Sequence, residues 1–127
     1  LVDILQEEFR VECLQEIMKS SRPDLLQGSL DLLILKTLSL EPMHGWSIAR
    51  RIQLVSEDKL LVKQGSLYPC LHRLEEKGWI VSEWGVSDTN RKAKYYSLSR
   101  TGRAQLEVET AYWKEFTQAV TLILEMV

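Results

Sequence analysis

The chain has 127 residues and a formal net charge of -2 at pH 7; 45% of the residues are hydrophobic and 27% are charged. These values indicate one globular domain, with or without a helical extension, and exclude a long disordered or fibrous chain. No apolar run approaches the ~20 residues of a membrane span and no secretory signal is recognisable, so we expect a cytosolic protein. The two cysteines form no CxxC pair and the two histidines lie apart from them, so we expect reduced thiols, no metal and no cofactor.

Residues 1–22 are expected to form a helical N-terminal extension. The sequence starts with Leu, and Met18 resembles a natural start, which leaves open whether this segment belongs to the native chain. The extension ends before Pro23, because a proline disfavours helical geometry at the preceding residue.

A second helix is predicted over residues 25–40, with Asp24 as its N-terminal cap. Its apolar residues cover more than one face, which a small core seldom requires. This pattern predicts that one side of the helix packs against the core and another side against a partner subunit.

A shorter helix is predicted over residues 46–55, after a turn at residues 41–45. Its inward positions are Ile48, Ala49 and Ile52. Arg50 and Arg51 then point outward, either as ordinary solvated residues or as contacts to a phosphate backbone.

The next helix is predicted over residues 67–77, with Pro69 in its first turn, where the N–H group that proline lacks would have no partner in the helix. Gly78 is expected to end this helix by adopting a positive φ. The positions that should face the core are Leu67, Leu71 and Leu74. The positions on the opposite, polar face are Pro69, His72 and Arg73.

The hydrophobic period then changes from that of a helix to that of a strand. Alternation over residues 80–86 and an aromatic-rich segment over residues 94–98 predict two antiparallel strands, joined by turn-forming residues at 87–90. The tip of this hairpin is basic. Because neighbouring strand residues point to opposite faces, only one of Tyr95 and Tyr96 can face outward.

The last helix is predicted over residues 100–126, with Ser99 as its cap. Its seven-residue repeat consists of Leu106, Trp113 and Val120, with Phe116 and Ile123 at intermediate positions. Such a repeat packs against another helix, and no other segment is long enough to cover it. A second copy of the chain is therefore the expected partner.

The three core helices, over residues 25–40, 46–55 and 67–77, are followed by a hairpin. This is the element order of a winged helix-turn-helix, which predicts a mainly α fold with a small β-hairpin. In this fold the third core helix, here residues 67–77, enters the DNA major groove, and the hairpin, or wing, reaches the backbone or the minor groove. On this basis residues 23–98 form a DNA-binding domain, and residues 99–127 form a long C-terminal dimerisation helix.

Residues 65–69 read Gly-Ser-Leu-Tyr-Pro and residues 71–78 read Leu-His-Arg-Leu-Glu-Glu-Lys-Gly. This specific combination resembles the PadR family of bacterial transcriptional regulators. Further stretches that resemble the family are residues 26–35, 44–49, 91–98 and 101–102. The similarity extends over most of the chain that follows Pro23.

The resemblance implies a homodimeric repressor that binds a palindromic operator in double-stranded DNA, with the last helix and the first core helix forming the dimer. The residues expected in this interface are Leu26, Leu30, Leu33, Leu106, Trp113, Phe116, Val120 and Ile123. Trp113 matches the tryptophan through which some members sense small aromatic effectors, although plain interface packing is the more usual role of a tryptophan at such a position. The wing lacks the family's glycine-rich pattern but keeps its positive charge.

The residues expected to contact DNA are Gln64, Ser66, Tyr68, Pro69, His72, Arg73, Lys77, Arg91, Lys92, Lys94, Tyr95 and Arg50. Their side chains suit phosphates and base edges. For the basic hairpin tip the alternative is a solvated surface, and for Tyr68 it is a place in the core. Trp46, Trp79 and Trp84 are interpreted as core or strand aromatics.

No catalytic arrangement is recognisable. Cys70 and His72 lie two residues apart on a helix and diverge by ~200°, so they cannot act together as nucleophile and base. Glu75 and Glu76 also point apart and cannot form a catalytic carboxylate pair. We therefore expect a DNA-binding regulator and not an enzyme. The alternative is a winged-helix adaptor that binds protein instead of DNA, which the net negative charge favours.

Overall fold

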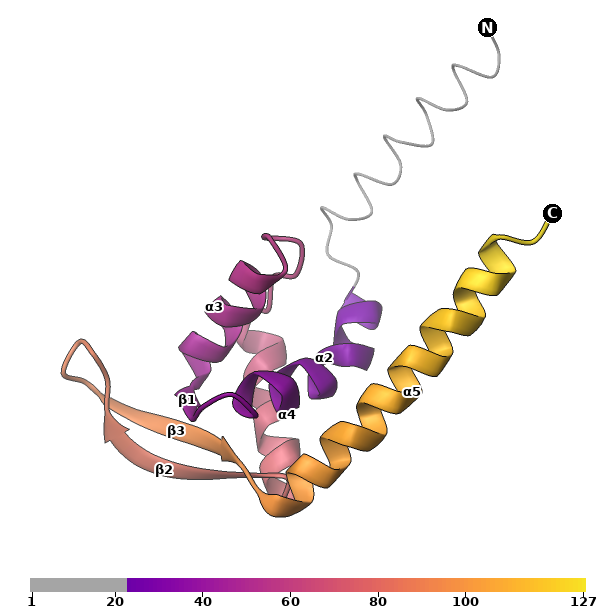
Figure 1. Cartoon of the computed structure of the whole chain (residues 1–127). Coiled ribbons are helices and arrows are strands. Elements are labelled where there is room, and N and C mark those ends of the chain that lie inside the picture. Colours follow the sequence, from indigo (N-terminus) through magenta and orange to yellow (C-terminus); the bar gives the residue numbers. More distant parts are fainter. Residues whose placement is uncertain (1–22) are drawn as a thin grey trace, which may run out of the picture.

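The computed structural model describes residues 23–127, and their side chains from residue 29 onward. The elements, shown in Figure 1, are α2 (Pro23–Leu38), β1 (Met43–His44), α3 (Gly45–Val55), α4 (Gln64–Glu76), β2 (Ile80–Val86), β3 (Lys92–Leu98) and α5 (Arg100–Leu124). The predicted extension over residues 1–22 lies outside the described residues, as does the side chain of Leu26. The mainly α fold with a small β-hairpin is confirmed.

The hairpin belongs to a three-stranded antiparallel sheet in the order β1-β3-β2. β2 pairs with β3 from Ile80 opposite Leu98 at the base to Val86 opposite Lys92 near the tip. On the other side of β3, Met43 of β1 lies opposite Tyr96. The sequence pattern does not reveal β1, because two residues are too few to show the alternation of a strand.

One hydrophobic core joins α2, α3, α4 and the base of the sheet. The predicted core positions of α4 are all buried: Leu67, Leu71 and Leu74. Leu30, which was expected at the dimer interface, is only 1% exposed and belongs to this core. Since a side chain without free surface in one copy cannot contact a second copy, that prediction for Leu30 is wrong.

Two helices begin earlier than the sequence predicts. α2 begins at Pro23, whose fixed φ suits the first turn, so Asp24 lies inside that turn and does not precede the helix. α4 begins at Gln64, because the N–H groups of Ser66 and Leu67 already bond the carbonyl of Lys63, at 3.0 and 2.9 Å. Pro69 therefore lies within the helix and not in its first turn. The helix ends as predicted, with Gly78 at φ 77°.

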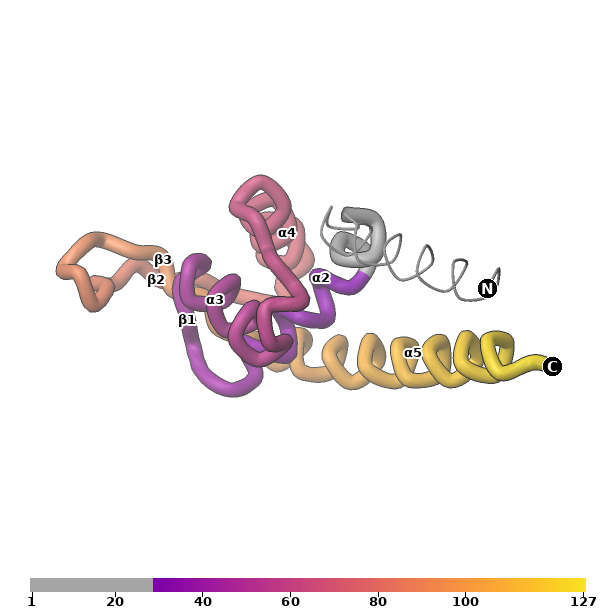
Figure 2. The backbone as a smooth tube through the Cα atoms, turned by 90° about the horizontal axis from the view of Figure 1, so that it is seen from above, coloured from indigo at the N-terminus to yellow at the C-terminus, as the bar shows by residue number. Residues whose placement is uncertain are grey.

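α5 leaves the core in the direction away from the wing. Figures 1 and 2 show the hairpin tip and the C-terminus at opposite ends of the molecule, with the N-terminal part of α5 beside α2. Ser99 caps α5 as predicted: its Oγ accepts a hydrogen bond from the N–H of Gly102 at 3.0 Å. Trp113, Phe116 and Ile123, farther along the helix, are exposed in the single chain.

Gly102 allows the first turn of α5 to dock on the residue that precedes β2. A Cβ atom at this position would lie 1.9 Å from the carbonyl oxygen of Trp79. We predict that Gly102→Ala lowers the free energy of unfolding by about 3 kcal/mol, because the backbone must move to relieve the overlap. Urea-induced unfolding followed by circular dichroism measures this change.

Gly65→Ala is the matched control for Gly102→Ala. A Cβ at Gly65 meets nothing within 4 Å, and alanine favours a helix more than glycine does. The control should leave stability unchanged or raise it by up to about 1 kcal/mol. Equal stability of the two variants would contradict the close approach at Gly102.

Candidate nucleic-acid interface

α4 presents a polar face to solvent along its whole length. The predicted DNA-contacting residues of this helix that are exposed are Gln64, Tyr68, Pro69, His72 and Arg73, and Lys77 follows its last turn. Ser66 is half-buried. The amphipathic pattern of the sequence therefore identified the outward face correctly.

Asp31 of α2 fixes the buried side of α4. Its Oδ1 accepts hydrogen bonds from Sγ of Cys70 at 2.8 Å and from Nη2 of Arg73 at 3.4 Å. Burial first, and then the hydrogen bond to Asp31, raise the pKa of the Cys70 thiol to about 12. Part of the hydrogen-bonding capacity of Arg73, a predicted DNA contact, is thus used within the chain.

The two wing tyrosines point to opposite faces, as the strand pattern predicts. Tyr96 is 6% exposed, and this burial raises its pKa. Tyr95 crosses the strand pair over Gly85, where a Cβ would come within 3.0 Å of the tyrosine ring. Its hydroxyl donates to the carbonyl of Val86 at 3.0 Å. Tyr95, a predicted DNA contact, therefore also stiffens the outer part of the wing.

Glu75 joins α4 to both long strands of the wing. Its Oε2 accepts a hydrogen bond from the hydroxyl of Ser82 in β2, and its Oε1 lies 3.3 Å from Nζ of Lys94 in β3. The Ser82 hydroxyl, followed by Lys94, lowers the pKa of this carboxyl. Glu75 is therefore ionised at neutral pH, and Lys94 is held in an ion pair instead of extending freely toward solvent.

A groove of about 920 Å³ separates the wing from α3 and α4. Its lining includes His44 of β1, Ser47 of α3, Tyr68 of α4, and Asp88, Arg91 and Lys92 of the wing. Segments that lie far apart in the sequence thus present hydroxyl, imidazole and cationic groups, with one carboxylate, to the same groove. Such groups suit a phosphate backbone.

Two exposed tryptophans line the same groove: Trp84 is a strand residue, as one of the two interpretations has it, whereas Trp46 lies in α3 and is neither a core nor a strand aromatic. Trp46 is 57% exposed and Trp84 is 61% exposed. The guanidinium of Arg50 lies 5.2 Å from the ring centre of Trp46, and Nζ of Lys92 lies 4.9 Å from that of Trp84. The position of Trp84 in the outer half of the hairpin, beyond the reach of the core, was the available sequence signal. Trp79, by contrast, packs against the core.

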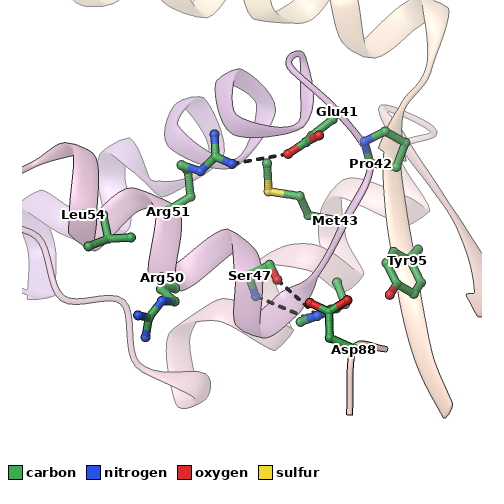
Figure 3. A pocket seen from close by; sticks show the side chains of 10 residues that line it. Glu41, Pro42, Met43, Ser47, Arg50, Arg51, Leu54, Asp88 and Tyr95 are labelled. Atoms are coloured by element: carbon green, nitrogen blue, oxygen red, sulfur yellow. Dashed lines mark hydrogen bonds and ion pairs between the residues drawn. The ribbon is translucent and has the colours of Figure 1, made fainter. Parts of the chain in front are cut away.

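Arg50 and Arg51 line a second pocket, of about 420 Å³, on the other side of the wing. Figure 3 shows both arginines extending from α3, with Tyr95 of β3 across the pocket. Arg51 pairs with Glu41 at 3.3 Å. Arg50 has no ion-pair partner among residues 29–127, so of the two it is the cation available to a phosphate.

The structure does not bring all predicted contacts to the main groove. Tyr68 meets Arg91, Lys92 and Lys94 there, whereas Tyr95 lines the second pocket. Lys77 lies at the opposite end of α4, roughly 20 Å along the helix from Gln64. There Nζ of Lys77 rests 4.6 Å from the ring centre of Trp79. His72 pairs with Glu76 on α4 itself, at 3.1 Å. The predicted set thus extends along the whole helix and is not one compact site.

A model of the transcriptional regulator PadR-like family matches residues 34–108, more than half of the chain. The chain belongs to the PadR family. Transcriptional regulator Rv3488 of Mycobacterium tuberculosis is 34% identical to it over 94 residues, which cover 74% of this chain and 84% of that protein. PadR regulators of known structure from Eggerthella lenta and Bacillus cereus are both 27% identical, with TM-scores of 0.73 and 0.71. The matches cover 91% and 82% of this chain, respectively, and 99% of each of the two regulators.

PadR family members are DNA-binding regulators of transcription without enzymatic activity. Within the residues that the structure describes, no group of three or more His, Cys, Asp or Glu residues is placed to hold a metal ion. Nor does a helix within residues 23–127 combine the length and the apolar character needed to span a bilayer. The groove between α3, α4 and the wing is accordingly the candidate DNA interface.

The raised pKa of Cys70 predicts an unreactive thiol. At pH 8 a thiol with a pKa of about 12 has a thiolate fraction on the order of 10⁻⁴, whereas an ordinary cysteine with a pKa of ~8.5 has ~0.2. In a Cys13→Ser background, we expect Cys70 to react with a disulfide reagent roughly a thousandfold more slowly than the urea-unfolded chain does. Rapid labelling of the folded protein would show that Asp31 and the core do not shield this thiol.

Proposed function

We propose that the chain is a homodimeric repressor that binds a palindromic operator on the chromosome in the bacterial cytosol. α4 lies in the major groove, the wing lies against the adjacent backbone, and the phosphates follow the groove between them. The single observation that supports this arrangement best is the convergence of Tyr68, Arg91 and Lys92 from two distant segments on one groove. The half-sites are spaced by about one helical turn of DNA, ~34 Å, or a multiple of it.

The proposed dimer interface is the exposed apolar surface of α5. Its exposed members are Trp113, Phe116, Val120 and Ile123. Leu33 of α2 and Leu106 of α5 are half-buried against the core and retain some surface for a second copy. An exposed apolar stripe on a helix of 25 residues is unfavourable in water, and a second α5 would cover it.

A small aromatic effector is proposed to bind beside Trp113. A shallow cavity of about 290 Å³ lies between α2 and α5, and its lining includes Leu32, Tyr112, Trp113 and Phe116. The rings of Trp113 and Phe116 are tilted, with their centres 6.2 Å apart. A planar aromatic molecule has suitable stacking partners there, and a second subunit would close the cavity.

Neutralising the free cations of the wing tests the proposed DNA contact. We predict that Arg91→Gln and Lys92→Gln each weaken binding to all duplexes and reduce the slope of log affinity against log salt by about 1. The measurement is fluorescence anisotropy with a duplex selected from a random pool, at several salt concentrations. Lys114→Gln is the control, because Lys114 is an exposed cation on α5, remote from the groove.

An unchanged salt slope in both wing variants would contradict a phosphate contact at the wing. If the selection yields no duplex, and neutralising the wing leaves a protein partner bound, the chain is a winged-helix adaptor instead.

A charged substitution in the apolar stripe of α5 tests the proposed dimer interface. We expect Phe116→Glu to convert a dimer at micromolar concentration into a monomer, because the carboxylate would be buried without a partner. Gln118→Glu introduces the same charge about 200° around the helix and should leave the dimer intact. Analytical ultracentrifugation distinguishes these outcomes, and a monomeric unsubstituted chain would contradict the dimer.

The proposed effector site is tested by Trp113→Ala. This variant should remove the fluorescence quenching by planar aromatic molecules, and unchanged quenching would contradict the effector site.

A further inference from the structure

Glu75 stands out among the carboxylates near the proposed DNA surface because its two oxygens bind both long strands of the wing. Glu75 lies on α4, and its partner Lys94 lines the groove between the wing and α4. A carboxylate close to phosphates repels them and so opposes binding. The contacts of its two oxygens, however, give Glu75 a structural role that favours binding.

Each oxygen of Glu75 holds a different strand of the wing. Oε2 accepts from Ser82 of β2, and Oε1 pairs with Lys94 of β3 at 3.3 Å. Ser82 lies opposite Tyr96 in the sheet, so Ser82 and Lys94 are diagonal neighbours on one face of the hairpin. One carboxylate thus connects α4, the proposed recognition helix, with both strands of the wing.

We infer that Glu75 is a positioning residue for DNA binding, which sets the position of the wing relative to α4 through Ser82 and Lys94. The inference rests on the proposed function and adds to it the residue that determines the distance between the two contacts. It also assigns Lys94 a different role from Arg91 and Lys92: Lys94 anchors the wing, while the other two contact phosphates.

Glu76 provides a control with the same change in charge. It is adjacent to Glu75, but its partner is His72 on α4, and it has no contact with the wing among the described interactions. Glu75→Gln keeps one acceptor oxygen and replaces the other with an amide group that can only donate, so the ion pair with Lys94 is lost and Ser82 can be held only by accepting from the amide. Both links to the wing are therefore weaker. Glu76→Gln removes the same negative charge without loosening the wing.

The two variants separate positioning from simple electrostatics. The probes are a duplex selected from a random pool by the unsubstituted chain and an unrelated duplex of equal length. We expect Glu75→Gln to lower the ratio of selected to unrelated affinity about tenfold, while affinity for the unrelated duplex stays the same or rises. Glu76→Gln should raise or preserve both affinities and keep their ratio.

Lys94→Gln gives an independent measurement. An anchoring lysine predicts a lower affinity ratio with an unchanged salt slope, whereas a phosphate contact predicts a slope reduced by about 1. The double variant Glu75→Gln/Lys94→Gln should lose no more of the ratio than the stronger single variant, since both changes break one link. Amide hydrogen exchange in β2 and β3 should accelerate in Glu75→Gln but not in Glu76→Gln.

The outcomes that overturn the inference differ from those that overturn the proposed function. If the unsubstituted chain binds DNA and Glu75→Gln behaves like Glu76→Gln in affinity ratio and in amide exchange, the positioning role is wrong and the proposed function stands. If the unsubstituted chain selects no duplex, the proposed function fails and the inference fails with it.

Discussion

Burial of one face of α4 is the constraint on which the rest of the structure depends. Leu67, Leu71 and Leu74 are fully buried between α2, α3 and the base of the sheet. Burying three such side chains contributes roughly 5 to 9 kcal/mol relative to their exposure, which fixes the rotation of the helix about its axis. The polar face must then point to solvent. The hydrophobic core therefore determines which side chains can reach a ligand.

Local sequence signals account for much of the fold. The helical spacing of leucines, the alternation over β2, the cap at Ser99 and the positive φ at Gly78 are local signals, and each is confirmed. The start of α4 is not predicted, because Gly65 is a poor helix former and Pro69 is typical of a first turn, so both residues favour a later start. β1 is missed because its two residues belong to a strand only through their pairing with β3.

The candidate site is predicted less completely, since its geometry depends on contacts between distant segments. A sequence identifies Arg73 and Lys94 as cations, but it does not show that Asp31 and Glu75 already bind them. It likewise predicts Trp46 as a core or strand aromatic, because large aromatic side chains are usually well buried. Trp46 is exposed because the start of α3 faces the groove beside the wing, and this arrangement depends on distant segments.

Which cations remain free matters more for DNA binding than the net charge of -2. Among residues 29–127, Arg51, Arg73 and Lys94 each pair with a carboxylate. Arg50, Arg91 and Lys92 have no such partner there, and two of them are supported by a tryptophan ring. The acidic residues near the candidate interface thus divide its basic residues into two groups. Of the paired cations, Arg73 links α4 to α2 and Lys94 links the wing to α4. The unpaired ones are those that the proposed function assigns to phosphates. A net negative charge is therefore compatible with a local cationic surface, because Asp31 and Glu75 act within the fold.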